Sequence, residues 1–195
     1  ALPTKKEGEI SLRNDGNNGT GEARATALVS RNGLFQYGDN LFIYAEADGT
    51  STPVLGTILG SITYSYPLNS RLQVSGSFGY SRRNLVELTG LLRNATYRQL
   101  QGYGQFEWTF QESLGQRWYG FAGLSINRND SYLSGEAYPL LDLFNNSWYS
   151  SGYGRFGLGA SGFVDKLAWN ANVYLLQGID GLSDSSHLEA LGFLG

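Results

Sequence analysis

The sequence predicts an all-β fold, an antiparallel up-and-down β-barrel of about eight to ten strands. Apolar or small residues alternate with polar ones along most of the chain, as in RLQVSGSFGYS at residues 71–81. This period of two is the pattern of a β-strand with two unlike faces. Turn-forming residues separate the alternating segments, and helical periodicity is nearly absent. The 195 residues are therefore read as one domain, residues 1–195, with a long outer loop around residues 133–150.

Five predicted strands lie in the first half of the chain, at residues 8–15, 21–31, 38–48, 54–66 and 71–81. The first is closed by the sequence GNNG, the second by Asn-Gly and the third by Asp-Gly, all of which favour turns. The fourth stops at a proline, which has no N–H to donate to a ladder. The fifth alternates from end to end.

Four more strands are predicted in the second half, at residues 95–111, 117–132, 152–163 and 166–177. A looser segment, residues 84–94, precedes the first of them. The tail, residues 178–195, is expected to end in a tenth strand or a short helix over residues 188–193. Odd-numbered turns are read as tight and later even-numbered ones, such as residues 133–150, as long.

Alternation alone leaves open which face of the sheet is inside. In the strand at residues 95–111, the apolar face consists of Leu100, Gly102, Gly104, Phe106, Trp108 and Phe110. The opposite face consists of Gln99, Gln101, Tyr103, Gln105, Glu107, Thr109 and Gln111. In a soluble protein the apolar face would pack into a core, whereas in an outer-membrane barrel it faces lipid and the polar face lines the lumen.

Three features favour the membrane. The strands commonly have 11 or more residues, whereas a membrane-spanning β-strand needs about 9–11 and globular strands average about 5–6. The polar faces carry groups large enough to line or fill a lumen. Aromatic residues recur near strand ends, where membrane-interface girdles lie; they are Tyr64, Tyr66, Tyr80, Trp108, Phe110, Trp118 and Tyr119. The predicted location is the bacterial outer membrane, with the lipid bilayer as partner.

Composition excludes several classes of function. The net charge is −3 with no basic patch, which argues against a nucleic-acid partner. The chain has no cysteine and one histidine, so a disulfide scaffold, a thiolate site and a histidine-rich metal site are excluded. No cofactor is expected. The chain also lacks methionine, which predicts a mature form cut from a precursor or an excised piece.

The candidate functional residues are the long polar side chains expected to face the lumen. They are Arg71, Gln73, Gln99, Gln101, Gln105, Glu107, Arg117, Arg155 and Lys166. In one interpretation they form a polar wall along which an unfolded chain or a small solute slides. In the other they pair across the lumen and fill it, as a barrel of eight to ten strands is narrow enough to allow.

A second pair, Arg24 and Asp39, is expected to bridge neighbouring strands and fix their register. Catalysis is not expected. The single histidine, His187, follows Ser-Asp-Ser-Ser in sequence, and a Ser–His–Asp relay needs side chains that converge in space. The acidic residues of the expected outer loops lack the spacing of a calcium loop, so no metal site is expected.

The order and spacing of several short motifs resemble the barrel of a known family. These motifs are Asn14-Asp15-Gly16, Thr20-Gly21 with Arg24, Asn32-Gly33, Gly38-Asp39-Asn40-Leu41, Tyr64-Ser65-Tyr66-Pro67, Tyr97-Arg98 and Leu124-Ser125-Ile126-Asn127-Arg128. The pattern is similar to the outer-membrane transporters of two-partner secretion, the TpsB or haemolysin-activator family. It spans residues 8–180.

The resemblance implies a sixteen-stranded outer-membrane barrel that moves an unfolded exoprotein client to the cell surface. Two departures stand out. The periplasmic POTRA domains are absent ahead of residue 1, and the family's V-R-G-[FY] lid motif does not occur in the chain. The chain therefore resembles the first half, or slightly more, of such a barrel, or a shortened relative of it. Self-association is expected if the barrel is incomplete.

Two other interpretations stay open. One is a small autonomous outer-membrane barrel for anchoring or adhesion, with residues 133–150 as its binding loop. The other is a soluble β-sandwich that acts as a binding module. Replacing Val74 or Leu100 by arginine separates them, because arginine on a lipid face at mid-membrane costs roughly 2–4 kcal/mol, whereas a soluble sandwich would lose its fold in plain buffer.

Overall fold

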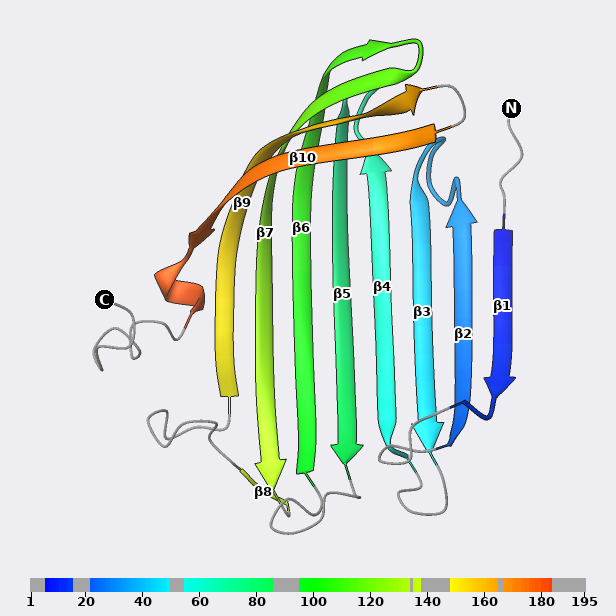
Figure 1. Ribbon diagram of the computed structural model, residues 1–195, viewed down its shortest axis with the longest axis vertical. Helices are drawn as coiled ribbons and strands as arrows, with labels where there is room; N and C mark the ends of the chain where they lie inside the picture. Colours follow the sequence, from blue (N-terminus) through cyan, green and yellow to red (C-terminus); the bar gives the residue numbers. More distant parts are fainter. Residues whose placement is uncertain are drawn as a thin grey trace.

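The computed structural model describes residues 6–15, 22–49, 55–85, 95–133, 135–137, 148–164 and 167–183. Within these ranges the chain forms a single antiparallel sheet (Figure 1). Its strands are β1 (Lys6–Arg13), β2 (Ala23–Asn32), β3 (Asn40–Gly49), β4 (Thr57–Pro67), β5 (Leu72–Leu85), β6 (Ala95–Ser113), β7 (Gln116–Leu133), β8 (Glu136–Ala137), β9 (Trp148–Val164) and β10 (Leu167–Gly178). A short 3-10 helix, η1 (Asp180–Leu182), follows.

The nine strands expected from alternation are confirmed, and they pair in chain order. The exception to that order is the two-residue strand β8, which pairs with the end of β7 inside the expected loop at residues 133–150. The looser segment after residue 83 begins inside β5, because Asn84 and Leu85 still pair with β6. The expected strand or helix at residues 188–193 lies outside the described residues.

The longest connections of the sheet follow odd-numbered strands, so the expected parity was wrong. The connections after β1, β5 and β7 are long and those after β4, β6 and β9 are short, whereas those after β2 and β3, residues 33–39 and 50–56, are equal in length. The short connections lie together at one end of the sheet, which we call the short-turn end, and the longer ones at the opposite, long-loop end (Figure 1). The sequence expectation failed because tight and loose connections share the same turn-forming residues.

A β-bulge interrupts the pairing of β6 with β7 between Thr109 and Gln111. The extra residue shifts the register by one, so the alternation of β6 reverses beyond it. Gln111 consequently aligns with Trp118, and Glu112 aligns with Arg117. The expectation that Gln111 shares the polar face of β6 was therefore wrong.

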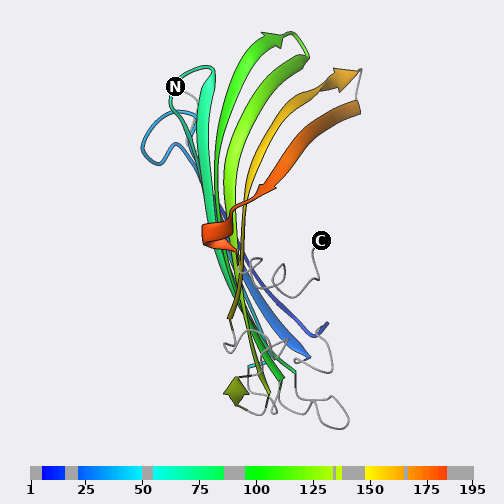
Figure 2. The same ribbon diagram turned by 90° about the vertical axis from the view of Figure 1, so that its left-hand side faces the viewer.

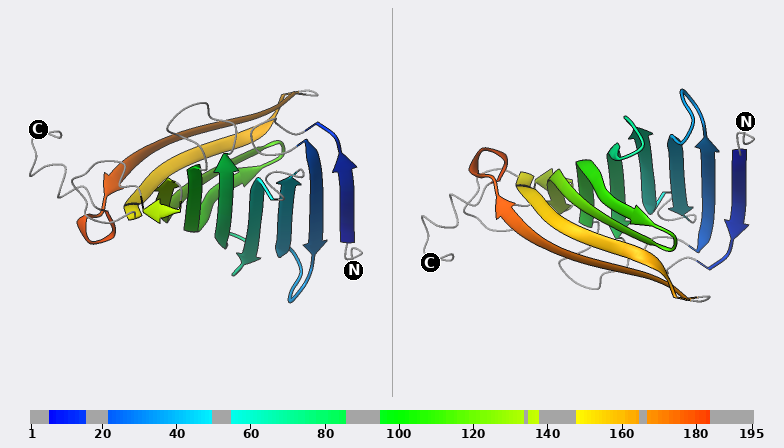
Figure 3. Two further views of the ribbon diagram at one scale, coloured as in Figure 1. Left: turned by 90° about the horizontal axis from the view of Figure 1, so that it is seen from below. Right: turned by 90° about the horizontal axis from the view of Figure 1, so that it is seen from above.

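The sheet is open. β1 and β10 are its two edges, and no pairing joins them among the described residues. The sheet is also strongly twisted and bent, with the short-turn ends of β6, β7, β9 and β10 curling over to one side (Figures 2 and 3). The predicted up-and-down antiparallel order is thus present, as a curved sheet without closure.

The two faces of the sheet differ in chemistry from one edge to the other. The registers place the apolar residues of neighbouring strands side by side, as in the row Ile43, Ile62 and Phe78. Many of these side chains are exposed: Phe106 is 57% accessible, and Val173 on the edge strand is 80% accessible. By contrast, Tyr119 and Phe121 on the polar face are only 7% and 9% accessible. The sheet therefore presents one continuous apolar surface, which the next subsections refer to as the apolar face.

Aromatic side chains mark the short-turn end of the apolar face. Tyr64 and Tyr66 lie with their ring centroids 6.3 Å apart on β4, and those of Trp108 and Phe110 are 6.0 Å apart on β6. No helix in the described part of the chain has the length and hydropathy to cross a bilayer.

Candidate functional site

The polar face of β5, β6, β7 and β9 carries most of the residues expected to line a lumen. The registers place seven of the nine on this one face. They are Gln73, Gln99, Gln101, Gln105, Glu107, Arg117 and Arg155. The strands hold these side chains there because each alternates polar residues with apolar ones, and the pleat separates the two sets.

The remaining two residues do not join them. Arg71 lies in the turn between β4 and β5, where its N–H donates to Asn69 Oδ1 at 2.8 Å. Its carbonyl oxygen accepts the N–H of Thr109 at 2.7 Å, so the backbone of Arg71 extends the pairing of β5 with β6. Lys166 lies outside the described residues. Alternation alone placed Arg71 on a strand because strand ends are the least certain part of such a prediction.

Arg117 organises the short-turn end of the polar face. Its Nη2 atom lies 2.5 Å from Glu107 Oε1, and its Nε donates to Thr109 Oγ1 at 2.9 Å. The guanidinium carbon lies 5.2 Å from the ring centroid of Tyr119, within the range of a cation–π contact. One positive side chain of β7 thus binds an acid and a hydroxyl on β6.

Arg155 forms the second polar cluster, near the middle of the face. Its Nη2 donates to Tyr103 OH and to Gln105 Oε1, each at 2.6 Å. Its guanidinium carbon also lies 5.1 Å from the ring centroid of Phe121 and 5.6 Å from that of Tyr174. Arg155 is on β9 and its hydrogen-bond partners are on β6, so the side chain crosses the whole of β7.

Glycines make these crossings possible, and sequence reasoning missed their role. In the register Gln105–Gly123–Arg155, the central glycine has no side chain to block the contact between its neighbours. A Cβ atom on Gly123 would lie 2.9 Å from the carbonyl oxygen of Gly104 and 3.4 Å from Gln105 Cβ. In the sequence, the sign of such a contact is a glycine at a polar-face position of one strand, with long side chains at polar-face positions of the two neighbouring strands.

The same arrangement recurs on β9. Tyr119 of β7 donates its hydroxyl to Asn172 Oδ1 of β10 at 2.9 Å, and Gly159 lies between them in the register. Gly157 likewise separates Phe121 from Tyr174, whose ring centroids are 6.5 Å apart. Side chains of the polar face therefore contact each other across an intervening strand, at positions where that strand carries a glycine.

The expected pair of Arg24 and Asp39 does not form, because the two residues lie at opposite ends of β2 and β3. Arg24 aligns with Asp48, and its Nε lies 3.6 Å from Glu46 Oε1. Asp39 precedes the first residue of β3, at the other end of the hairpin. Both residues fix structure, but they do so with different partners.

Asp39 holds the turn between β2 and β3. Its carboxylate is buried and accepts the N–H groups of Leu34, Phe35 and Gln36 at 2.7, 2.8 and 3.1 Å, as well as the hydroxyl of Tyr64 at 2.7 Å. Burial by itself raises the pKa of Asp39, but these donors outweigh it, and the pKa falls well below the ordinary value of 3.8. The carboxylate has its donors in the turn and on β4 and is not set up to bind a ligand.

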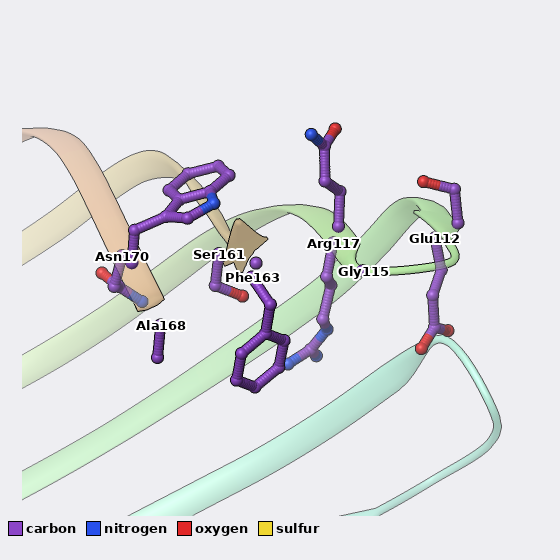
Figure 4. Close-up of a pocket in the computed structure, with 11 residues that line it drawn as sticks. Glu112, Gly115, Arg117, Ser161, Phe163, Ala168 and Asn170 are labelled. Atoms are coloured by element: carbon purple, nitrogen blue, oxygen red, sulfur yellow. The ribbon is translucent and has the colours of Figure 1, made fainter. Parts of the chain in front are cut away.

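An open hollow of about 570 Å³ lies at the short-turn end (Figure 4). Its walls come from the hairpin of β6 and β7 and from the adjoining ends of β9 and β10, and they include Glu112, Arg117, Phe163 and Asn170. Gly115, at the hairpin tip, has a φ of +87°, a conformation that favours glycine. Within the described ranges no group of three or more histidine, cysteine, aspartate or glutamate side chains is placed to hold a metal ion.

Searches of protein-family models and of curated proteins find no match to this chain. Among solved structures, CdiB from Escherichia coli matches with a TM-score of 0.73 at 16% sequence identity. CdiB is a TpsB-family outer-membrane transporter of two-partner secretion, and the match covers 92% of this chain and 32% of CdiB. The chain thus spans about a third of that protein's length. At this identity the match concerns the fold: the open antiparallel meander corresponds to part of the CdiB barrel, which confirms the resemblance to the family.

Proposed function

We propose that this chain forms a section of an outer-membrane transporter barrel that carries an unfolded exoprotein across the bilayer. The observation that carries the proposal is the division of the sheet into two faces. The apolar face extends across all nine strands that pair in chain order, with large side chains exposed along the middle of the strands, a surface that a soluble protein would cover. Lipid covers such a face in a membrane barrel.

The polar face has the chemistry of a wall along which a chain slides. In one cluster the charge of Arg117 is paired with Glu107. In the other, Arg155 is hydrogen-bonded to the neutral side chains of Tyr103 and Gln105. The face therefore offers amides and hydroxyls without a concentrated charge or a large apolar patch that would hold a passing segment. This supports the wall interpretation for a large barrel, and the fold match to part of the CdiB barrel supports the large barrel.

The two open edges support the same proposal. Among the described residues, β1 and β10 each have one side of backbone N–H and C=O groups to which no strand is paired, and in the bilayer core such groups must be paired. Strands from elsewhere in the protein, or from a second copy, would have to pair with both edges. A barrel completed by such additional strands encloses a wider lumen than nine strands could.

Photo-crosslinking in the native outer membrane tests the transport role. The residue p-benzoylphenylalanine is placed at Gln105 on the polar face, and in a matched variant at its neighbour Phe106 on the apolar face. Transport predicts that the Gln105 variant captures a secreted protein in transit while the Phe106 variant does not. If neither position captures a client and secretion is unaffected by loss of the protein, the transport proposal fails and anchoring or adhesion takes its place.

A further inference from the structure

The hairpin of β6 and β7 projects beyond its neighbours at the short-turn end. β5 begins at Leu72, opposite Trp108, and the N–H of Thr109 donates to the carbonyl oxygen of Arg71 at 2.7 Å. Beyond Thr109, no described residue of β5 pairs with β6. From there to Leu114 at its tip, the hairpin continues for about 16 Å past the turn between β4 and β5. Since β6 has 19 residues and a membrane-spanning strand needs about 9–11, this end lies outside the hydrocarbon core in the proposed barrel.

The adjoining ends of β9 and β10 meet this projection and complete the hollow of about 570 Å³. The backbone N–H of Phe163 donates to the carbonyl oxygen of Gly115 at 2.8 Å, which ties the end of β9 to the tip of the β6–β7 hairpin. A Cβ atom on Gly162 would collide with the same oxygen, so this close approach requires glycine. The volume is within the roughly 300–1,000 Å³ of ligand sites. The hollow, which we call the mouth hollow, therefore has a backbone framework that holds its walls together.

The side chains of the mouth hollow lie on the polar face. One row of the register consists of Glu112, Arg117, Ser161 and Asn170. Phe163, which is opposite Ala168, lies in the next row of the same face. Figure 4 shows Glu112, Arg117 and Phe163 extending from their strands to the same side. The mouth hollow therefore adjoins the polar face at its short-turn end, where a lumen would open.

Two side chains of the mouth hollow are available to a ligand. Phe163 is 65% accessible, whereas Phe121 on the same face is 9% accessible. Glu112 is exposed and, within the described ranges, makes no hydrogen bond or ion pair. Arg117, the residue opposite Glu112, is bound to Glu107 instead. The mouth hollow thus combines an exposed aromatic ring with one carboxylate whose charge no described residue compensates.

These two groups complement the side chain of a lysine or an arginine. A carboxylate pairs with the cationic head, an aromatic ring attracts the same cation to its face, and the long aliphatic stem covers apolar surface. A metal ion would require further ligands, and the described residues contain no cluster of acidic or histidine side chains that could hold one. A basic side chain is therefore the occupant whose charge and shape match the mouth hollow.

We infer that the mouth hollow binds a lysine or arginine side chain of the unfolded client as the client enters the lumen. The inference rests on the proposed function, which brings a polypeptide to the polar face. The short turns of an outer-membrane barrel face the periplasm, so the mouth hollow lies on the side from which the client arrives. Exposed ion pairs are weak, and a weak site retains an entering segment without stopping its passage.

Fluorescence anisotropy with the full-length protein in detergent tests the inference. The probe is a labelled glycine–serine peptide that contains lysines, and the same peptide with norleucine in place of lysine is the neutral control. Glu112→Gln should weaken binding of the lysine peptide about fivefold, because it removes an exposed ion pair. Phe163→Leu should weaken it about twofold, because it removes the aromatic face.

Glu9→Gln is the matched control variant and should leave binding unchanged. Glu9 is also exposed on the polar face, but it lies on β1 at the opposite edge of the sheet. Heat-modifiable gel mobility confirms that each variant is folded. A charge swap completes the set: Glu112→Lys should lose the preference for the lysine peptide and prefer a peptide with glutamate in place of lysine.

The outcomes separate this inference from the transport proposal. Equal binding of the lysine and norleucine peptides by the unaltered protein would overturn the role of the mouth hollow, and so would equal losses in Glu112→Gln and Glu9→Gln. Capture of a client at Gln105 together with either result would overturn the mouth hollow alone. Selective lysine binding without capture of a client would keep the mouth hollow as a peptide site and overturn its assignment to a transported client.

Discussion

Replacing Gly157 by alanine should destabilise the folded sheet, whereas the same replacement at Gly104 should not. Both glycines lie inside long strands, β9 and β6, but on opposite faces. Gly157 lies on the polar face under the side chains of Phe121 and Tyr174. Gly104 lies on the apolar face, where a Cβ atom would meet nothing within 4 Å.

The magnitude follows from the space around Gly157. An added Cβ would lie 2.6 Å from Phe121 Cζ and 2.7 Å from Tyr174 Cβ, whereas carbon atoms pack at about 3.5–4.0 Å. The Phe121 ring, which is 9% accessible, would have to move by about 1 Å within a crowded cluster. Such overpacking costs about 1–3 kcal/mol, or roughly a five- to more than a hundred-fold change in the folding equilibrium. Alanine at Gly104 should be neutral or stabilise by up to about 1 kcal/mol.

Urea unfolding of the protein refolded into lipid vesicles measures both effects, with the folded fraction read from heat-modifiable gel mobility. We expect a lower midpoint for Gly157→Ala and an unchanged or higher midpoint for Gly104→Ala, at equal slopes. Equal stability of Gly157→Ala and the unaltered protein would refute the packing of Phe121 and Tyr174 over this glycine. A large loss in Gly104→Ala would refute the assignment of an open face there.

Three further predictions concern the face assignment, the polar face and the turn. Leu124→Arg should lower stability in vesicles by about 2–4 kcal/mol, because it puts a charge on the lipid face near mid-strand, while Ser125→Arg on the opposite face should have little effect. The urea assay compares the two variants, and equal losses of stability would contradict the face assignment. A double-mutant cycle with Glu107→Ala and Arg117→Ala should give a coupling of about 1 kcal/mol, and additive effects would contradict the ion pair. Asp39 contributes stability that is present above its ordinary pKa of 3.8 and is lost as pH falls toward its lower folded pKa. The variant Asp39→Asn should therefore be less stable than the unaltered protein at neutral pH and approach it in strong acid. A stability difference that does not depend on pH would contradict this role of Asp39.

Strand order and the division into faces were predictable from the sequence, because both depend on local alternation. Predicting that Gln99, Gln101 and Gln105 share a face required only the period of two, and the structure places all three on one face of β6. The bulge between Thr109 and Gln111 was not predictable in this way, since one extra residue leaves the local composition unchanged. It reversed the expected face of Gln111.

Contacts across several strands were the other part that the sequence could not supply. The bonds from Arg155 to Tyr103 and Gln105 depend on the register of β6, β7 and β9 and on Gly123 between them. Alternation says which face a side chain occupies but not which residue of the next strand lies beside it. Arg24 and Asp39 were paired for the same reason, as residues of adjacent strands whose relative register was unknown.

Lipid accessibility along β7 is the measurement that bears most directly on the membrane barrel. Single cysteines from residue 120 to residue 127 are unique within this cysteine-free chain and accept a nitroxide label in the native outer membrane. Collision rates with oxygen, which concentrates in lipid, and with a water-soluble nickel chelate then report the surroundings of each position. We predict a period of two, with Ala122, Leu124 and Ile126 in lipid and Phe121, Ser125 and Asn127 facing the lumen. Equal access to the nickel chelate at every position would contradict a lipid-facing apolar surface.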